Sequence, residues 1–352
     1  MSSPRKPIRL VIVDDSPTMR AILQARFERE DDITVVGAAA DAQQGRQMIR
    51  ELDPDVVTLD VEMPGMNGLD FLEKIMQLRP TPVIVVSGST QEGAEATARA
   101  LALGAVGCYA KNDRGGSLAI DDSGRLADLV RDAAKVRFVT RTAPPVATPP
   151  RTSTAPRSPG LVERPRLIAI GSSTGGVEAL QVLLGGFPAD CPPTLVVQHI
   201  SSRFAPAVAR TLDQSCPPRI LIAEPDMPLR DGHVYIAPGD DRHLTVAGKT
   251  GMLHQRLRRG DPVSGHLPSV DMLFHSVAEL IGAQAVGILL TGMGSDGAEG
   301  LLAMAQSGAR TIAQDEATCT VFGMPRAAIA LGAAGVVAPI GTIARHAFSK
   351  AA

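Results

Sequence analysis

Short runs of β-branched residues alternate with amphipathic stretches, and this alternation restricts the fold of the chain more than any other feature. In the first part of the chain, strands are expected at five apolar runs, "RLVIV", "ITVVG", "DVVTL", "PVIVV" and "GCYA". Helical patterns follow them near residues 17–29, 41–52, 68–78, 91–103 and 125–137. Strand and helix in strict alternation predict a parallel sheet with helices on both faces.

A second region of the same kind begins near residue 165. Strands at "RLIAIG" and "TLVVQ" are followed by helices near 176–185 and 203–214. The middle of the region is expected to contain short strands and hairpins, at "RILIAE", "HVYIAP", "HLTVAG" and "GMLHQRL". The alternation returns with "AVGILLTG", "RTIAQ" and "GVVAP". We therefore predict a second doubly wound parallel-sheet α/β domain that carries a β-hairpin insertion.

A proline-rich segment separates the two regions. It reads "TRTAPPVATPPRTSTAPRSPGLVERP" and contains almost no residue that a core could bury. Such a composition cannot offset the entropy lost on ordering, so an extended linker is expected. The chain of 352 residues is thus divided into a first domain at 1–138, a linker at 139–164 and a second domain at 165–352.

Charge and cysteine usage narrow the class of protein. The formal net charge of -2 disfavours a protein that coats nucleic acid. The four cysteines are far apart and have no C-x-x-C spacing, which is typical of reduced thiols. The first apolar run ends in two aspartates, and no run is long enough for membrane insertion. A cytoplasmic protein is expected.

Polar residues follow the strands of the first domain at corresponding places. Asp14 and Asp15 follow the first strand, Asp60 the third, Ser87 ends the fourth, and Lys111 follows the fifth. A lone aspartate after a strand is more often a cap or turn residue, but parallel sheets bind ligands at these strand ends. Three carboxylates there would repel one another unless Mg²⁺ joined them. The lysine and the hydroxyl can then hold a phosphoryl group on one carboxylate.

The motifs "VIVDDS", "VVTLDVEMPGMNGLDFL", "VVSG" and "YAK" resemble the receiver domain of two-component response regulators. The resemblance implies a flavodoxin-like fold in which a histidine kinase phosphorylates Asp60. It further implies that Ser87 and Lys111 contact the phosphoryl group. The residues it implies as Mg²⁺ ligands are Asp14, Asp15, Asp60 and the main-chain carbonyl of Glu62.

The chain departs from that family directly after Lys111. Receiver domains usually have a proline there, whereas this chain has Asn112. The glycine-rich insertion at 112–124, "NDRGGSLAIDDSG", then delays the last helix. The departure concerns the local geometry at Lys111 and the surface of the last helix, but not the phosphoacceptor.

In the second domain, the stretch "LIAIGSSTGGVEAL" joins a strand to a helix. It lacks the lysine of a phosphate loop and the glycine spacing of a dinucleotide site. The pattern Gly171-x-Ser173-x-Gly175 fits a sharp turn that exposes a nucleophilic serine. Taken alone, a plain helix-capping turn is at least as compatible with these residues.

A serine nucleophile needs a base and an acid that orients the base. His199 is the histidine that directly follows a strongly apolar strand, and Asp296 follows the apolar run at 286–290. Each has an ordinary structural alternative, a surface or capping histidine and an aspartate at a helix N-terminus. Gly292 and Gly294 flank Met293 and free its N–H to face a developing oxyanion.

Longer motifs of the second domain are similar to the catalytic domain of bacterial chemotaxis protein-glutamate methylesterases. They are "IAIGSSTGGVEAL", "VVQHI", "HVYIAPGDDRHL", "HLPSVDMLFHSV", "LLTGMGSDGAEGLLAM" and "AQDEATCTVFGMPRAAIALGA". The resemblance implies Ser173 as nucleophile, His199 as general acid and base, and Asp296 as the residue that orients His199. Thr174 and Met293 would assist the oxyanion site. Ser172 is the neighbouring alternative nucleophile.

Together the two resemblances imply a phosphorylation-regulated hydrolase. Its substrates would be glutamate γ-methyl esters on methyl-accepting chemotaxis receptors, and it would also deamidate receptor glutamines. A chemotaxis histidine kinase would be the phosphodonor, Mg²⁺ would serve the receiver domain, and ester hydrolysis would need no cofactor. In the family, the receiver domain covers and inhibits the catalytic cleft.

Two alternatives stay open at the level of sequence. A receiver domain joined to a domain that only binds a partner would be a regulator without enzymatic activity. The basic runs Arg203–Arg210 and Arg256–Arg259 can dock an acidic receptor surface, or they can be ordinary solvated arginines.

Overall fold

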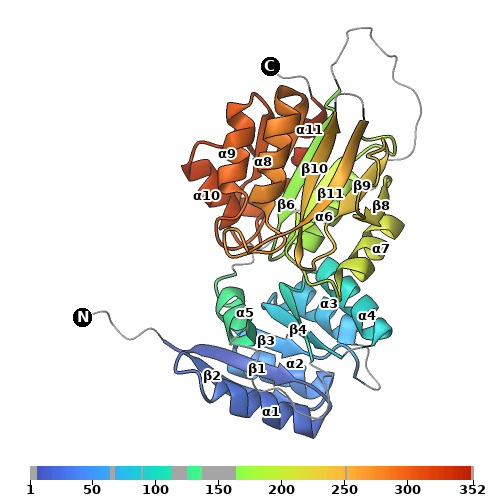
Figure 1. The fold of residues 1–352 in the computed structure, drawn as a ribbon. Helices are drawn as coiled ribbons and strands as arrows, with labels where there is room; N and C mark the ends of the chain where they lie inside the picture. The colour runs from blue at the N-terminus through green and yellow to red at the C-terminus, as the bar shows by residue number, and fades with distance from the viewer. Residues whose placement is uncertain are drawn as a thin grey trace, which may run out of the picture.

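The structure, a computed structural model, describes residues 6–63, 68–88, 90–111, 125–136, 164–249 and 252–349. Two α/β units follow one another along the chain and lie against each other (Figure 1). The insertion at 112–124, with Asn112, lies outside the described residues. So does the predicted linker at 139–164, apart from its last residue.

The N-terminal unit contains a parallel sheet of five strands in the order β2-β1-β3-β4-β5. The strands are β1 (Ile8–Val13), β2 (Ile33–Ala39), β3 (Val56–Leu59), β4 (Val83–Ser87) and β5 (Gly107–Ala110). The helices are α1 (Pro17–Phe27), α2 (Ala42–Leu52), α3 (Gly68–Leu78), α4 (Gln91–Ala102) and α5 (Arg125–Ala133). This strand order is that of flavodoxin, so the predicted fold of this unit is confirmed.

The C-terminal unit contains a seven-stranded parallel sheet in the order β14-β13-β12-β6-β7-β9-β8. The strands are β6 (Leu167–Ser172), β7 (Thr194–Gln198), β8 (Arg219–Ile222), β9 (His233–Ile236), β12 (Ala285–Leu289), β13 (Arg310–Gln314) and β14 (Val336–Ala338). Strand order reverses between β6 and β12, and a crevice for ligands is expected outside the carboxyl ends of these two strands.

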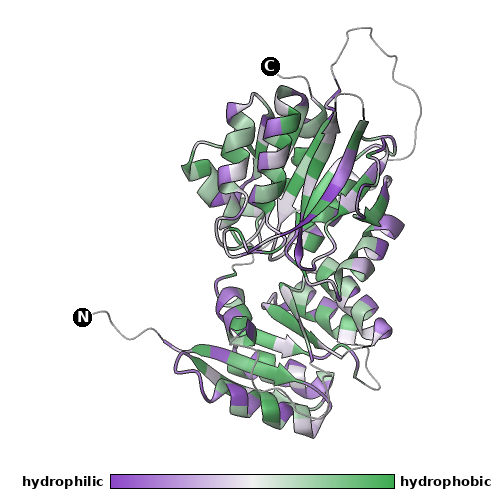
Figure 2. Ribbon diagram, viewed as in Figure 1, coloured by the Kyte–Doolittle hydropathy of each residue, from purple (hydrophilic) through white to green (hydrophobic). Residues whose placement is uncertain are grey.

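Six α-helices of the described residues cover this second sheet. They are α6 (Gly176–Gly185), α7 (Ala205–Ser215), α8 (Val270–Leu280), α9 (Ala298–Gln306), α10 (Met324–Ala330) and α11 (Ile340–Phe348). In this part of the chain no helix combines the length and the apolar character that crossing a bilayer requires. The sheet strands are largely apolar, whereas the helices carry both hydrophilic and hydrophobic residues (Figure 2).

The predicted hairpin insertion is present as β10 (Arg242–Lys249) and β11 (Met252–Arg259), which pair with each other in antiparallel fashion. The other two strands expected in this hairpin-rich region behave differently. Strands β8 and β9 pair in parallel and extend the main sheet beyond β7. The run "VYI" of β9 is buried throughout, as in a strand covered on both faces.

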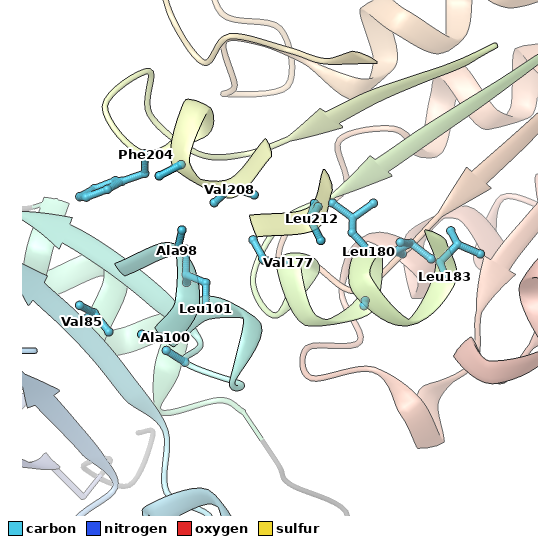
Figure 3. Packing of buried hydrophobic residues seen from close by; sticks show 14 of the residues in the cluster. Val85, Ala98, Ala100, Leu101, Val177, Leu180, Leu183, Phe204, Val208 and Leu212 are labelled. Carbon is cyan, nitrogen blue, oxygen red and sulfur yellow. The ribbon is translucent and has the colours of Figure 1, made fainter. Parts of the chain in front are cut away.

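The two units share a packed apolar contact, which Figure 3 shows at close range. Ala98 and Leu101 of α4 pack on the C-terminal unit, where Val208 of α7 and Val177 of α6 belong to the same buried cluster. At the exposed edge of this contact, an ion pair joins Glu95 to Arg210. Helix α4 is therefore one of the elements through which the N-terminal unit packs against the second unit.

Candidate active site

The acidic cluster of the N-terminal unit lies at the carboxyl ends of β1 and β3. Asp14 and Asp60 are buried, and oxygens of Asp14, Asp15 and Asp60 lie within 4.8 Å of one another. Nζ of Lys111 is 2.9 Å from Oδ2 of Asp14 and 2.5 Å from Oδ2 of Asp60. The structure thus brings together the residues predicted for Mg²⁺ and phosphoryl binding.

In this cluster, burial and the attraction between opposite charges shift the pKa values of Asp14 and Lys111 in opposite directions. Burial raises the pKa of Asp14, although the ammonium of Lys111 works against the increase. Burial also acts to lower the pKa of Lys111, but the carboxylates of Asp60 and Asp14 outweigh it and raise that pKa. Lys111 is therefore a cation at neutral pH and compensates part of the negative charge. The chemistry of three clustered carboxylates also suits a hard divalent cation.

The side chain of Glu62 forms contacts that the sequence did not predict. Its carboxylate accepts hydrogen bonds from the Gly88 N–H (2.9 Å) and from Oγ1 of Thr90 (2.8 Å), and Oγ of Ser87 lies 3.4 Å away. Thr90 is also the N-cap of α4, where its Oγ1 accepts the N–H of Gly93. Glu62 therefore links the carboxyl end of β3 to α4, the helix that contacts the second unit.

In the C-terminal unit, the three predicted catalytic residues come together at the switch point of the sheet. The register of β6 and β7 pairs Ser172 with Gln198, so the next residues, Ser173 and His199, lie side by side. Nε2 of His199 is 2.8 Å from Oδ2 of Asp296, which follows β12. Ser173 and His199 line the same pocket of about 540 Å³.

The hydrogen bond to Asp296 determines which nitrogen of His199 can act as a base. A carboxylate only accepts, so Nε2 must carry the proton and Nδ1 must be the proton-accepting nitrogen. Nδ1 is buried and has no partner within the described part of the chain. In serine proteases Nδ1 faces the aspartate and Nε2 the serine, so the ring nitrogens have exchanged roles here.

Asp296 is fully buried and has four hydrogen-bond donors around its carboxylate. Besides His199, it accepts from Oγ of Ser269 (2.7 Å) and from the N–H groups of Val270 (2.7 Å) and Asp271 (3.0 Å). Burial acts to raise the pKa of Asp296, but the bond from His199 and the backbone N–H groups outweigh it and lower that pKa. Asp296 is therefore an anion.

The carboxylate of Asp296 is bound by a helix that the sequence did not point to. As an alternative to a catalytic role, the sequence offered a position at the N-terminus of the helix that follows, α9, and Asp296 does lie just before that helix. Its carboxylate, however, lies at the N-terminus of α8, where backbone N–H groups and the helix dipole favour an anion. The contribution of Ser269 was missed, because the segment "HLPSVDMLFHSV" carries no sign of which strand end it approaches.

The two candidate serines differ in their surroundings. Ser172 is fully buried and donates its hydroxyl to Oε1 of Gln198 (2.6 Å), whose Nε2 donates to the carbonyl oxygen of Ser173 (2.9 Å). A Cβ at Gly176 would collide with that same Oε1. Ser173 instead lines the pocket. The geometry favours Ser173 over Ser172 as the reactive hydroxyl.

Backbone N–H groups approach the pocket beside Ser173. A Cβ at Gly292 would lie 2.8 Å from Cβ of Ser173, so only glycine allows the 292–294 loop to come this close. Met293 and Thr174 both line the pocket. Their backbone N–H groups have no acceptor within the residues that the structure describes. Such free donors are what an oxyanion site requires.

The N-terminal unit forms one wall of this pocket. Arg125, Leu129 and Asp132 of α5 and Cys108 of β5 line it opposite the serine loop. Just beyond α5, Nζ of Lys135 lies 4.0 Å from Sδ of Met293. A large substrate therefore cannot reach Ser173 across this wall unless the two units move apart.

A second histidine covers the ring of His199. The rings of His199 and His266 are stacked, with centroids 3.8 Å apart and planes 8° from parallel. His266 also lines the pocket. Burial, together with the neighbouring His199, lowers the pKa of His266 to about 4. His266 is therefore neutral at physiological pH.

This lowered pKa makes stability depend on pH. The folded state excludes a proton that the unfolded state takes up below the ordinary value of 6.5, so stability is lost as the pH falls from 6.5 to about 4. Relative to His266→Gln, wild type should lose on the order of 2 kcal/mol of unfolding free energy over this range. Urea unfolding at several pH values measures the difference. If the unfolding free energies of the two proteins changed with pH in parallel, this prediction would be wrong.

Comparisons with known proteins agree with this geometry. Residues 168–347 match the CheB methylesterase family, and residues 10–118 match the response regulator receiver domain. The chain is 50% identical over 327 residues to protein-glutamate methylesterase/protein-glutamine glutaminase 1 of Caulobacter vibrioides, covering 93% of each chain. It is also 48% identical to the protein-glutamate methylesterase/protein-glutamine glutaminase of Agrobacterium fabrum. This match covers 95% of this chain and 94% of that one.

A solved structure matches the C-terminal unit. It is the crystal structure of the CheB methylesterase catalytic domain of Thermotoga maritima, with 34% sequence identity and a TM-score of 0.51. The match covers 52% of this chain and 97% of that one. The curated relatives thus match nearly the whole chain, and the two family models match its two units.

Proposed function

Because this chain belongs to the CheB methylesterase family, we propose that it hydrolyses glutamate γ-methyl esters on methyl-accepting chemotaxis receptors and releases methanol. Its relatives are named as both methylesterases and glutaminases, so the proposal includes deamidation of receptor glutamines. The observation that carries it is the 2.8 Å bond between His199 and Asp296 directly beside Ser173. The proposed location is the cytoplasm.

The proposed reaction is acyl transfer to Ser173 followed by hydrolysis. Nδ1 of His199 takes the serine proton while Oγ attacks the ester carbonyl. The N–H groups of Thr174 and Met293 stabilise the oxyanion, and Asp296 stabilises the imidazolium. His199 returns the proton to the departing methanol, or to ammonia from a glutamine. Water activated by His199 then releases the glutamate, and this hydrolysis uses no cofactor.

The N-terminal unit supplies the proposed regulation. A chemotaxis histidine kinase would phosphorylate Asp60, and Asp14, Asp15, Asp60 and the main-chain carbonyl of Glu62 would hold Mg²⁺. The ion would neutralise charge on the phosphoryl group. Ser87 and Lys111 would contact the phosphoryl oxygens, and Lys111 already forms an ion pair with Asp60.

Phosphorylation of Asp60 would act on the contact between the units. It adds about -1.5 to -2 of charge. Movement of Ser87 toward this charge would break its contact with Glu62, and Glu62 also holds the N-cap of α4. Since α4 packs on α6 and α7, the change would favour the arrangement in which the N-terminal unit leaves the pocket. The proposed division at 1–138, 139–164 and 165–352 permits this movement through the linker.

The test is methanol release from membranes that contain methylated receptors, measured with the full chain with and without acetyl phosphate. We expect release that acetyl phosphate increases. A regulator without enzymatic activity would release no methanol under either condition, and this result would reject the proposal.

Reversing a charge at the contact tests inhibition by the N-terminal unit. Glu95 and Arg210 are 3.4 Å apart and about half exposed, so neither is needed for folding. Glu95→Arg places like charges together and should raise phosphodonor-independent methanol release about fivefold at low salt. Adding Arg210→Glu to this variant restores the attraction and should return release to the wild-type level. Unchanged release in both variants would argue against a closed inhibitory contact.

A further inference from the structure

A buried histidine of the β10–β11 hairpin, His243, is connected to Asp296 by hydrogen bonds through Ser269. His243 of β10 is 2% exposed. Its Nδ1 is 3.1 Å from the backbone N of Ser269, and its Nε2 is 3.0 Å from the carbonyl oxygen of Asp261. A backbone N–H only donates, so Nδ1 must be the acceptor and Nε2 must carry the proton. Both ring nitrogens are thus engaged in fixed roles.

Ser269, whose backbone N–H is bound by His243, in turn binds the carboxylate of Asp296. Its hydroxyl donates to Oδ1 of Asp296 (2.7 Å) and accepts the N–H of Met272 (3.4 Å) as the N-cap of α8. Ser269 is fully buried, so its hydroxyl is shielded from bulk water. Oδ2 of Asp296, the other oxygen of the carboxylate, is the one that faces His199. Rotation of the carboxylate would break both contacts at once.

We propose that Ser269 and His243 are positioning residues that hold the carboxylate of Asp296 in the orientation needed by His199. His243 holds the backbone of Ser269, and Ser269 holds Oδ1 of Asp296. The hairpin insertion, which contributes no reacting group, thereby becomes part of the catalytic machinery. The inference rests on the proposed function only in the choice of substrate.

The chain offers a matched control on the same helix. Ser276 of α8 is half-buried, accepts the N–H of Val246 in β10 (3.1 Å) and donates to the carbonyl of Leu273 (2.7 Å). It ties the same hairpin to the same helix but does not touch Asp296. Ser276→Ala therefore reproduces the structural cost of losing a serine hydroxyl without the effect on the catalytic acid.

The experiment measures methanol release by the full chain with acetyl phosphate. Ser269→Ala should lower kcat about tenfold to a hundredfold with little change in KM, because ground-state binding is untouched. Ser269→Thr keeps the hydroxyl and should stay within about threefold of wild type, as should Ser276→Ala. His243→Leu should resemble Ser269→Ala, whereas His243→Asn, which keeps an acceptor near Nδ1, should recover part of the loss.

A double-variant comparison separates positioning from stability. In an Asp296→Asn background the orientation of the carboxylate no longer matters, so Ser269→Ala should cost less than about twofold. Equal losses in both backgrounds, or equal kcat values for Ser269→Ala and Ser276→Ala, would overturn the proposal.

A second readout does not depend on the identity of the substrate. The rate at which a fluorophosphonate modifies Ser173 reports the activation of the serine itself. We expect this labelling rate to rank the variants in the same order as their kcat values for methanol release. If wild type releases no methanol, the proposed function fails, but this order of labelling rates still decides the role of Ser269.

Discussion

Replacing Ser173 with alanine should lower methanol release at least about 10⁴-fold, because no other hydroxyl can take its place in the acyl transfer. Ser173 is the hydroxyl at the pocket, next to His199 across the β6–β7 pair. The fold should not change, since the hydroxyl of Ser173 forms no hydrogen bond within the described residues. Thermal unfolding checks this, and kcat for methanol release measures the effect.

The control is Ser172→Ala, which removes the neighbouring hydroxyl. Ser172 donates to Gln198, which in turn holds the carbonyl of Ser173. Its loss should destabilise the protein by about 1 to 2 kcal/mol and lower kcat less than about tenfold. If Ser172→Ala abolished release while Ser173→Ala preserved it, the nucleophile would have been assigned to the wrong residue.

Ser172 and Ser173 show which part of the site the sequence predicts and which part depends on contacts between distant residues. Their order along the chain, after an apolar strand and before glycines, predicts a turn at which one hydroxyl is presented. The spacing Gly171-x-Ser173-x-Gly175 favours Ser173 as the centre of this turn, but Ser172 stays the neighbouring alternative, because both residues are small and polar. The decision depends on Gln198, which reaches across from β7 to bind Ser172. That contact joins residues 26 positions apart and has no local signature.

Strand ends were the most predictable part of both sites. Asp60 and His199 each follow a buried apolar strand, Lys111 follows the partly buried β5, and parallel strands bring their carboxyl ends to one edge. Periodicity and burial are local properties, so the sequence shows them directly. The side-chain contacts of Glu62 with the β4–α4 loop depend on the direction in which one carboxylate points, and no sequence pattern predicts that direction.

Strand direction and helix approach were less predictable. The sequence predicts β8 and β9 among hairpins because they are short apolar runs with no helical pattern between them, yet they are parallel. The position of the α8 N-terminus beside Asp296 depends on the path of the β10–β11 hairpin and of residues 260–269 that connect it to α8. Ser269 and Asp296 are 27 residues apart, and only the completed fold brings them into contact.

Asp296→Asn should lower kcat for methanol release about 10⁴-fold without a comparable change in KM. In wild type both carboxylate oxygens accept, Oδ2 from His199 and Val270, and Oδ1 from Ser269 and Asp271. An amide has one acceptor, so its NH₂ group must face donors whichever way it lies. If NH₂ faces His199, Nε2 must become the acceptor and Nδ1 the protonated nitrogen. The base that takes the Ser173 proton is then lost.

The control for this prediction is Asp271→Asn, which also neutralises a buried carboxylate at the start of α8. Burial raises the pKa of Asp271, and its oxygens accept from the Gly300 N–H and Oγ of Ser264, both at 2.8 Å. It makes no contact with His199, so Asp271→Asn should change stability more than kcat, with kcat within about tenfold of wild type. If Asp296→Asn lost no more activity than Asp271→Asn at matched folded fractions, the carboxylate would serve the fold of α8 and not the protonation state of His199.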